Sequence, residues 1–148
     1  MVNYRYPPKP LSMEDILELL RENAEEVPYP MELPSEEDLL DIQEELLIHI
    51  PFEMREFLLL ASDIVLGHLE PVTASDPRSH TYLPEVASLA WELGLPRYLV
   101  PLCVAGDIYY AVEPEGEVVS WSVEQQDFLE ESWESVWYWA RDCWLATL

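Results

Sequence analysis

The sequence predicts a single α+β domain, in which N-terminal helices are followed by a small, mainly antiparallel sheet and by a C-terminal helix packed on that sheet. Three observations support this prediction. Apolar residues recur at helical spacing up to residue 61, short runs rich in Val and Tyr lie between glycine-containing turns over residues 98–121, and tryptophans recur at helical spacing over residues 133–144. The chain has 148 residues, 49% of them hydrophobic, which is enough for one domain (1–148) with its own core.

The first segments of the chain predict an extended lead-in followed by an additional helix. Residues 1–11 combine three prolines with tyrosines, which favours an extended conformation. Ser12 can cap a helix over residues 12–27, and the acidic residues that follow it stand where the helix dipole favours anions. Pro28 ends this helix because proline cannot continue the backbone hydrogen bonding.

Two further helices are predicted on either side of Pro51. Ser35 is the expected cap of the first, whose apolar stripe contains Leu39 and Ile42. Pro51 interrupts this helix, since the residue before a proline is biased toward an extended conformation. A third helix is therefore expected to begin near Glu53.

The middle of the chain changes from helical to extended patterns. Residues 64–72 predict a strand and a turn, and the polar residues 73–81 predict an exposed loop. Residues 83–93 have the pattern of a short amphipathic helix, which Gly94 ends.

Three strands are predicted next, at residues 98–104, 107–112 and 117–121. Residues 98–104 are apolar throughout, which predicts a central position in the sheet. Gly106 and Gly116 stand in the two turns between these strands.

The C-terminal part predicts a helix that runs nearly to the end of the chain, with a break near Ser132 as the alternative. Residues 122–125 have the form of a capping box, a serine followed three residues later by glutamine, at the start of this helix. Trp133, Trp137 and Trp144 recur at helical spacing and are expected to be buried. Trp139 lies off this stripe and is expected to be exposed, where it would be a candidate contact, because tryptophan is enriched at the centres of protein interfaces.

The charge balance points to a basic protein as the partner. The chain carries 30 acidic and 7 basic side chains, so its formal net charge is −23. Nucleic acids and anionic membranes are excluded as expected partners, because their phosphate groups are bound by Lys and Arg. Residues 98–140 contain nine acidic residues and no basic one, although a solubilising surface is the alternative interpretation.

The expected partner contacts are acidic residues at the turns of the sheet and at the start of the final helix. Turn residues project into solvent, and a carboxylate in the first turn of a helix adds to the same negative field. These candidates are Asp107, Glu113, Glu115, Glu117, Glu124 and Asp127. A second group lies at the start of the second helix: Glu36, Glu37 and Asp38.

The sequence contains no motif for catalysis, metal binding or cofactor binding, so we expect no enzyme activity, no metal and no cofactor. The isolated triplet His68-Leu69-Glu70 lacks the Pro-Cys-x-x-Cys element of zinc deaminases. Cys103 and Cys143 lie in apolar stretches and are expected to be buried free thiols of a reducing compartment. The N-terminus lacks an apolar signal segment and no apolar run reaches the length of a membrane span, so a cytoplasmic location is expected.

Several short segments carry a resemblance to a known family. The segments Leu-Pro-Ser-Glu-Glu-Asp-Leu at 33–39 and Val-Pro-Leu-Cys-Val-Ala-Gly-Asp-Ile-Tyr-Tyr at 100–110 resemble the opening motif and the strand pair of the SUKH superfamily, which includes the fungal Smi/Knr cell-wall regulators. Met54 stands where an aromatic residue is usual, and Ala-Ser-Asp at 61–63 replaces an expected Asn-Gly. The resembling segments are residues 33–39, 44–51, 52–59, 100–110, 115–118 and 133–144, so the resemblance runs from residue 33 to the end and leaves out the first helix.

The resemblance implies an α+β fold without catalysis and, in bacteria, an immunity protein that binds and neutralises a toxin, often a nuclease. A nuclease needs a basic surface, to which a chain of −23 is complementary. Three alternatives remain open: an intracellular regulator or scaffold of the Smi/Knr type, an enzyme with an acid–base pair in a cleft, and a nucleic-acid mimic. A neighbouring toxin gene, a perturbed acid–base pair or regularly spaced carboxylates would distinguish them.

Overall fold

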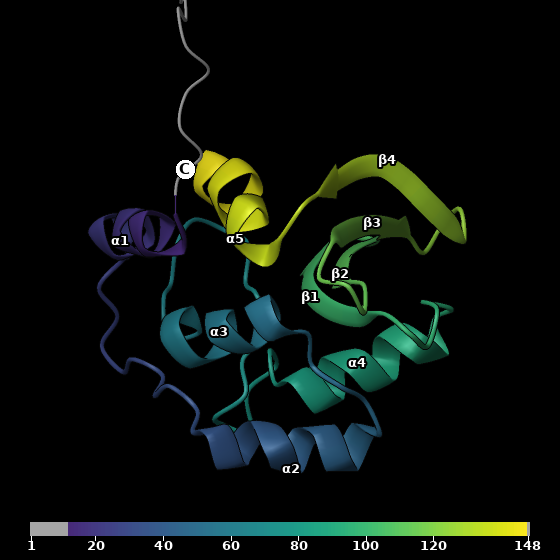
Figure 1. Cartoon of the computed structure of the whole chain (residues 1–148), viewed down its shortest axis with the longest axis horizontal. Helices are drawn as coiled ribbons and strands as arrows, with labels where there is room; N and C mark the ends of the chain where they lie inside the picture. The colour runs from purple at the N-terminus through teal and green to yellow at the C-terminus, as the bar shows by residue number, and fades with distance from the viewer. Residues whose placement is uncertain (1–11, 148) are drawn as a thin grey trace, which may run out of the picture.

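The computed structural model describes residues 12–147, which form helices before and after a four-stranded sheet (Figure 1). The predicted α+β class is confirmed. The four longer helices are α1 (Met13–Asn23), α2 (Glu36–Leu46), α3 (Phe52–Ala61) and α4 (Leu83–Glu92). The strands are β1 (Val100–Ala105), β2 (Ile108–Val112), β3 (Val118–Ser122) and β4 (Asp127–Trp133). The chain then forms α5 (Val136–Trp139), a π-helical segment η1 (Ala140–Trp144) and a 3₁₀ turn η2 (Leu145–Thr147).

Capping boxes start the first two helices at the predicted residues. Ser12 Oγ accepts a hydrogen bond from the Asp15 backbone N–H at 3.2 Å, and the Asp15 carboxylate accepts one from the Ser12 N–H at 3.3 Å. Ser35 and Asp38 form the same reciprocal pair at 3.1 and 2.9 Å. These bonds satisfy backbone donors that have no partner within the helix.

The sheet is antiparallel in the order β1-β2-β3-β4, so β1 is an edge strand. The expectation that residues 98–104 form a central strand is therefore wrong. Their apolar character has another cause, because the chain segment at Pro71 and Val72 runs beside β1 and the Val72 N–H donates to Leu102 O at 2.8 Å. α4 also packs against β1, and β1 is buried over most of its length.

Two predictions for the middle segment are wrong in detail. Residues 64–72 form turns and one isolated bridge, Pro71 to Cys103, in place of a strand. The 73–81 segment is not an exposed loop throughout, since Thr73 and Thr81 are buried and bridge each other through their hydroxyl groups at 2.7 Å. The helix that follows is confirmed as α4.

The long C-terminal helix predicted from residue 122 is absent, and β4 occupies its first part. Ser122 Oγ does accept a hydrogen bond from the Gln125 N–H at 3.1 Å, as a capping box requires. However, Gln126 has a left-handed φ of 54°, and its N–H donates to Ser122 O at 2.8 Å. The chain therefore reverses into a hairpin, and the helix begins only after Ser135, which caps α5. Glu124 consequently lies in a hairpin turn and not in a helix.

The core lies on both faces of the sheet. Tyr109 and Ala111 of β2 face a smaller cluster with residues of α4 and the segment after it, whereas Val112 belongs to the larger cluster with the other helices. Figure 1 shows α1 and α5 on one side of α3 and α2 on the other. In the larger cluster, Phe57 makes edge contacts with Trp137, with ring centres 5.5 Å apart.

The expected burial of the tryptophans is confirmed for Trp137 and Trp144, and Trp133 is half-buried at the end of β4. The expectation that Trp139 is exposed is wrong, because its side chain is 0% exposed. The π-helical segment explains the error: the Leu145 N–H donates to Ala140 O, five residues back. Residues five apart share a face in such a segment, and Trp139 stacks on Trp144 with ring centres 6.3 Å apart.

The two cysteines are free, as expected; Cys103 is buried and Cys143 is half-buried. Burial raises the pKa of the Cys103 thiol to about 12. Among the helices of residues 12–147, none has the length and apolar character needed to cross a membrane.

Candidate functional site

The strand order separates the predicted contacts into two groups at opposite ends of the sheet. The β1–β2 and β3–β4 turns share one end, where the Val123 N–H donates to Asp107 O at 2.8 Å. The β2–β3 turn lies at the other end, on the order of 17 Å away for strands of this length. Asp107, Glu124 and Asp127 thus fall in one group and Glu113, Glu115 and Glu117 in the other, so the structure does not bring the six together.

The β2–β3 turn lies against the start of α3. Gly116 adopts a left-handed φ of 104°, and its N–H donates to Glu113 O at 2.8 Å, which closes the turn. A side-chain Cβ at Gly116 would stand 3.8 Å from Glu53 Oε1 of α3. The Glu53 side chain of α3 therefore lies close to this turn, and we call Glu53, Glu113, Glu115 and Glu117 the turn surface.

Glu113 and Glu53 of the turn surface each have other carboxylates nearby. Partial burial raises the pKa of Glu113, and the nearby Glu117 and Glu115 raise it further. Burial also raises the pKa of Glu53, as do the neighbouring charges of Glu56 and Glu134, and a hydrogen bond from Ser135 only partly offsets these effects. Negative charge is thus held at the turn surface at a cost to the stability of the free protein.

Two exposed apolar side chains lie between the end of α2 and the first residue of α3, directly before Glu53 of the turn surface. Leu47 is 84% exposed and adopts a left-handed φ of 55°, and Phe52, at the first position of α3, is 72% exposed. Sequence patterns do not identify them, because an apolar residue beside a helical stripe is assigned to the core. The position of Phe52 directly after Pro51 is the one local signal, since the first residue of a helix need not share its buried face.

The second predicted group lies at the start of α2. Asp38 is half-buried and caps its own helix, whereas Glu36 and Glu37 are exposed. An 11-residue helix, about 16 Å long, separates them from the connection to α3. Partial burial raises the pKa of Tyr82, and the charges of Glu45 and Asp41, further along α2, raise it more.

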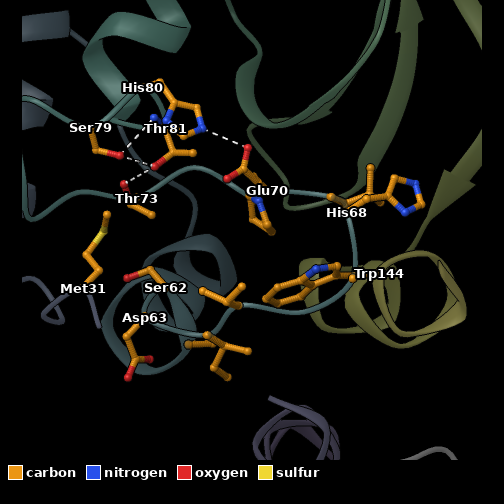
Figure 2. Close-up of a pocket in the computed structure, with 16 residues that line it drawn as sticks. Met31, Ser62, Asp63, His68, Glu70, Thr73, Ser79, His80, Thr81 and Trp144 are labelled. Carbon is orange, nitrogen blue, oxygen red and sulfur yellow. Dashed lines mark hydrogen bonds and ion pairs between the residues drawn. The ribbon is translucent and has the colours of Figure 1, made fainter. Parts of the chain in front are cut away.

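A hollow of about 340 Å³ lies between the end of α3, the segments at residues 62–73 and 79–81, and Trp144 (Figure 2). Three of its hydroxyl groups bond to one another: Thr81 Oγ1 lies 2.7 Å from both Thr73 Oγ1 and Ser79 Oγ. At its rim, His80 Nε2 lies 2.9 Å from Glu70 Oε2. The lining therefore combines apolar groups and mutually bonded hydroxyls with the carboxylates of Asp63 and Glu70.

The His68-Leu69-Glu70 triplet does not form a joint site, because Glu70 pairs with His80 while His68 lies apart (Figure 2). Within the part of the chain that the structure describes, no group of three or more His, Cys, Asp or Glu residues is arranged to hold a metal ion.

Comparisons with known proteins place these features in a family. A family model described as SMI1-KNR4 cell-wall, designated SUKH_5, matches residues 13–145 and so includes α1, which the resembling motifs did not cover. A solved structure of a protein from Pseudomonas syringae pv. tomato is 57% identical, with a TM-score of 0.86; the similarity covers 90% of this chain and 98% of that one. No curated protein gives a significant match.

Proposed function

Since the chain belongs to the SUKH_5 family of SMI1-KNR4 cell-wall domains, we propose that it is a protein-binding domain that acts as an immunity protein and neutralises a cationic toxin by direct binding. The proposal draws on the turn surface. There, Glu113 and Glu53 have raised pKa values, because they are partly buried and because other carboxylates surround them. A basic partner would relieve this repulsion, which the free protein bears as a loss of stability.

The neighbouring apolar side chains support the same proposal. Protein interfaces combine a few apolar anchors with a polar rim, and aromatic residues are enriched among the anchors. Phe52 and Leu47 supply exposed apolar area, and Glu53 follows Phe52 directly. We expect these two side chains to make the apolar contacts and the carboxylates to align the partner.

The test uses, as the candidate toxin, the protein encoded by the gene next to that of the chain. The two proteins are produced together in one cell and growth is followed, while the affinity of the purified pair is measured by calorimetry. The wild-type chain is expected to restore growth. The variant Glu113→Lys/Glu115→Lys/Glu117→Lys is expected to lose protection and to bind at least about tenfold more weakly, as for central interface residues.

A matched variant separates local contact from total charge. Glu18→Lys/Glu22→Lys/Glu26→Lys changes the net charge equally at exposed positions in and just after α1. It is expected to keep protection, and circular dichroism checks the folding of both variants. Equal protection by both variants would contradict a contact at the turn surface, whereas binding of several proteins without protection would favour a regulatory scaffold.

A further inference from the structure

We propose that a groove running from Trp144 past His80 to Leu89 binds an extended segment of a cationic protein. This inference takes the cationic nature of the partner from the proposed function, but it concerns a different surface. The groove is formed by α4, β1 and the segment that connects α3 to α4, and the turn surface is not part of it.

Three adjoining hollows make up the groove. The first, of about 340 Å³, ends at Trp144 and is the hollow described above. A smaller one of about 110 Å³ lies between Val72, Val86 and Val104, and an open one of about 620 Å³ lies between α4 and Tyr109. His80 lines all three, so the hollows adjoin one another at this side chain, and Glu70, which pairs with His80, lines the first two. An elongated, open shape fits a stretch of polypeptide better than a compact small molecule.

The groove follows the outer edge of β1. On that side, the segment at residues 71–72 pairs with β1 only as far as Cys103, through the Pro71–Cys103 bridge and the Val72–Leu102 hydrogen bond. Beyond it, Val104 has no strand neighbour on that side among residues 12–147, and its side chain lines two of the hollows. A strand edge beside a helix is a common place for extended peptides to bind, since the backbone supplies affinity and alternate side chains enter hollows.

The side chains of the groove fit a segment in which apolar and basic residues alternate. Leu89 and Val104 are partly exposed on its two walls. Glu85 adds a carboxylate on the α4 side, and Glu70 adds another at the centre. Arg78 also lines the open hollow, and its guanidinium lies 3.9 Å from the Asp76 carboxylate. A second copy of the chain is a poor occupant, because two molecules of net charge −23 repel each other.

The experiment uses the full chain and three synthetic nine-residue peptides. The first alternates lysine with valine, leucine and phenylalanine; the second has glutamate for each lysine; the third has serine for each apolar residue. Affinities are measured by calorimetry, and amide shifts of the labelled chain locate the site by NMR. The first peptide is expected to bind, with shifts at residues 79–89 and 103–105, and the other two to bind at least about tenfold more weakly.

Two variants at leucines of nearly equal exposure test where the peptide binds. Leu89→Arg places a cation in the groove, whereas Leu40→Arg places one on α2; the two leucines are 51% and 50% exposed. Leu89→Arg is expected to weaken binding of the first peptide about tenfold or more, and Leu40→Arg to leave it unchanged. Val104→Arg is a second groove variant, and circular dichroism checks each protein.

The outcomes separate this inference from the proposed function. Equal binding of the serine peptide, or unchanged binding of the first peptide by Leu89→Arg and Val104→Arg, would contradict peptide binding in the groove. Loss of peptide binding only in the Glu113/Glu115/Glu117 variant would place the peptide at the turn surface and would also contradict it. Peptide binding in the groove by a chain that gives no protection from the toxin would support the groove and contradict the immunity function.

Discussion

Two buried tryptophans of the C-terminal segment differ by one hydrogen bond. Trp144 Nε1 donates to Leu66 O at 3.0 Å, and both residues are buried. Trp137 Nε1 is also buried, but it has no hydrogen-bond partner within residues 12–147. The same substitution at the two sites therefore removes similar packing and different polar contacts.

We predict that Trp144→Phe destabilises the protein more than Trp137→Phe does. The first change leaves the buried Leu66 carbonyl without its donor, which costs about 1–3 kcal/mol, whereas the second removes a donor that had no acceptor. Urea unfolding followed by circular dichroism measures both. Equal losses of unfolding free energy would show that the hydrogen bond contributes little.

A second prediction at this scale concerns Glu113, whose pKa is raised from its ordinary value of 4.5 by partial burial and by Glu117 and Glu115. The folded protein then binds a proton more readily than the unfolded chain, so this group lowers stability as pH rises through its folded pKa. Glu113→Gln should therefore raise the melting temperature at pH 7 and have little effect at about pH 3, below the ordinary range of glutamate.

The control for that measurement is Glu92→Gln, which removes one charge at an exposed position of α4. Only the Glu113 variant should show a pH-dependent gain. A gain of equal size in both proteins would indicate that total charge, and not crowding at the turn surface, limits stability.

Local hydrogen bonds decide where the helices begin. Ser12 and Ser35 each form a complete capping box, and both were identifiable because a serine stands three residues before an aspartate ahead of an apolar stripe. α4 was identifiable from its periodicity and from Gly94, and β1 to β3 from the glycine turns between them. Where pattern and turn chemistry agree, the elements could be predicted.

β4 shows why the remaining elements could not be predicted from the sequence. The capping hydrogen bond expected at Ser122 forms, but the left-handed Gln126 turns the chain back along β3. Whether such a bond opens a helix or closes a hairpin depends on pairing with a strand elsewhere, which local sequence does not contain. The same limit applies to the site, because strand order separates Glu113 from Asp107, and the groove arises between distant segments.

We predict that Ser35→Ala lowers the unfolding free energy by about 1 kcal/mol, because the Asp38 N–H loses its acceptor. Ser88→Ala is the matched control, since Ser88 lies exposed within α4, where alanine is the better helix former. Urea titrations of both proteins provide the comparison. An unchanged midpoint for Ser35→Ala would mean that packing alone positions α2.

At the scale of the whole molecule, the excess of acidic side chains gives a negative field that acts beyond any single contact. Three arginines of the described chain pair with carboxylates: Arg21 lies 2.8 Å from Asp63, Arg78 lies 3.9 Å from Asp76, and Arg141 lies 2.6 Å from Asp142. With a net charge of −23, we expect such a surface to attract a basic protein during diffusion and to repel nucleic acid. The central claim is that the chain binds a cationic protein.

The association rate constant with the proposed cationic toxin, measured by stopped-flow fluorescence over a range of salt concentrations, tests this claim most directly. Surface charges are screened beyond about 10 Å at ~0.1 M salt, and steered association slows steeply as salt increases. We predict a fall of about tenfold or more between ~0.02 and ~0.5 M sodium chloride, with a much smaller change in the dissociation rate. An association rate constant that does not change over this range would contradict binding to a cationic partner.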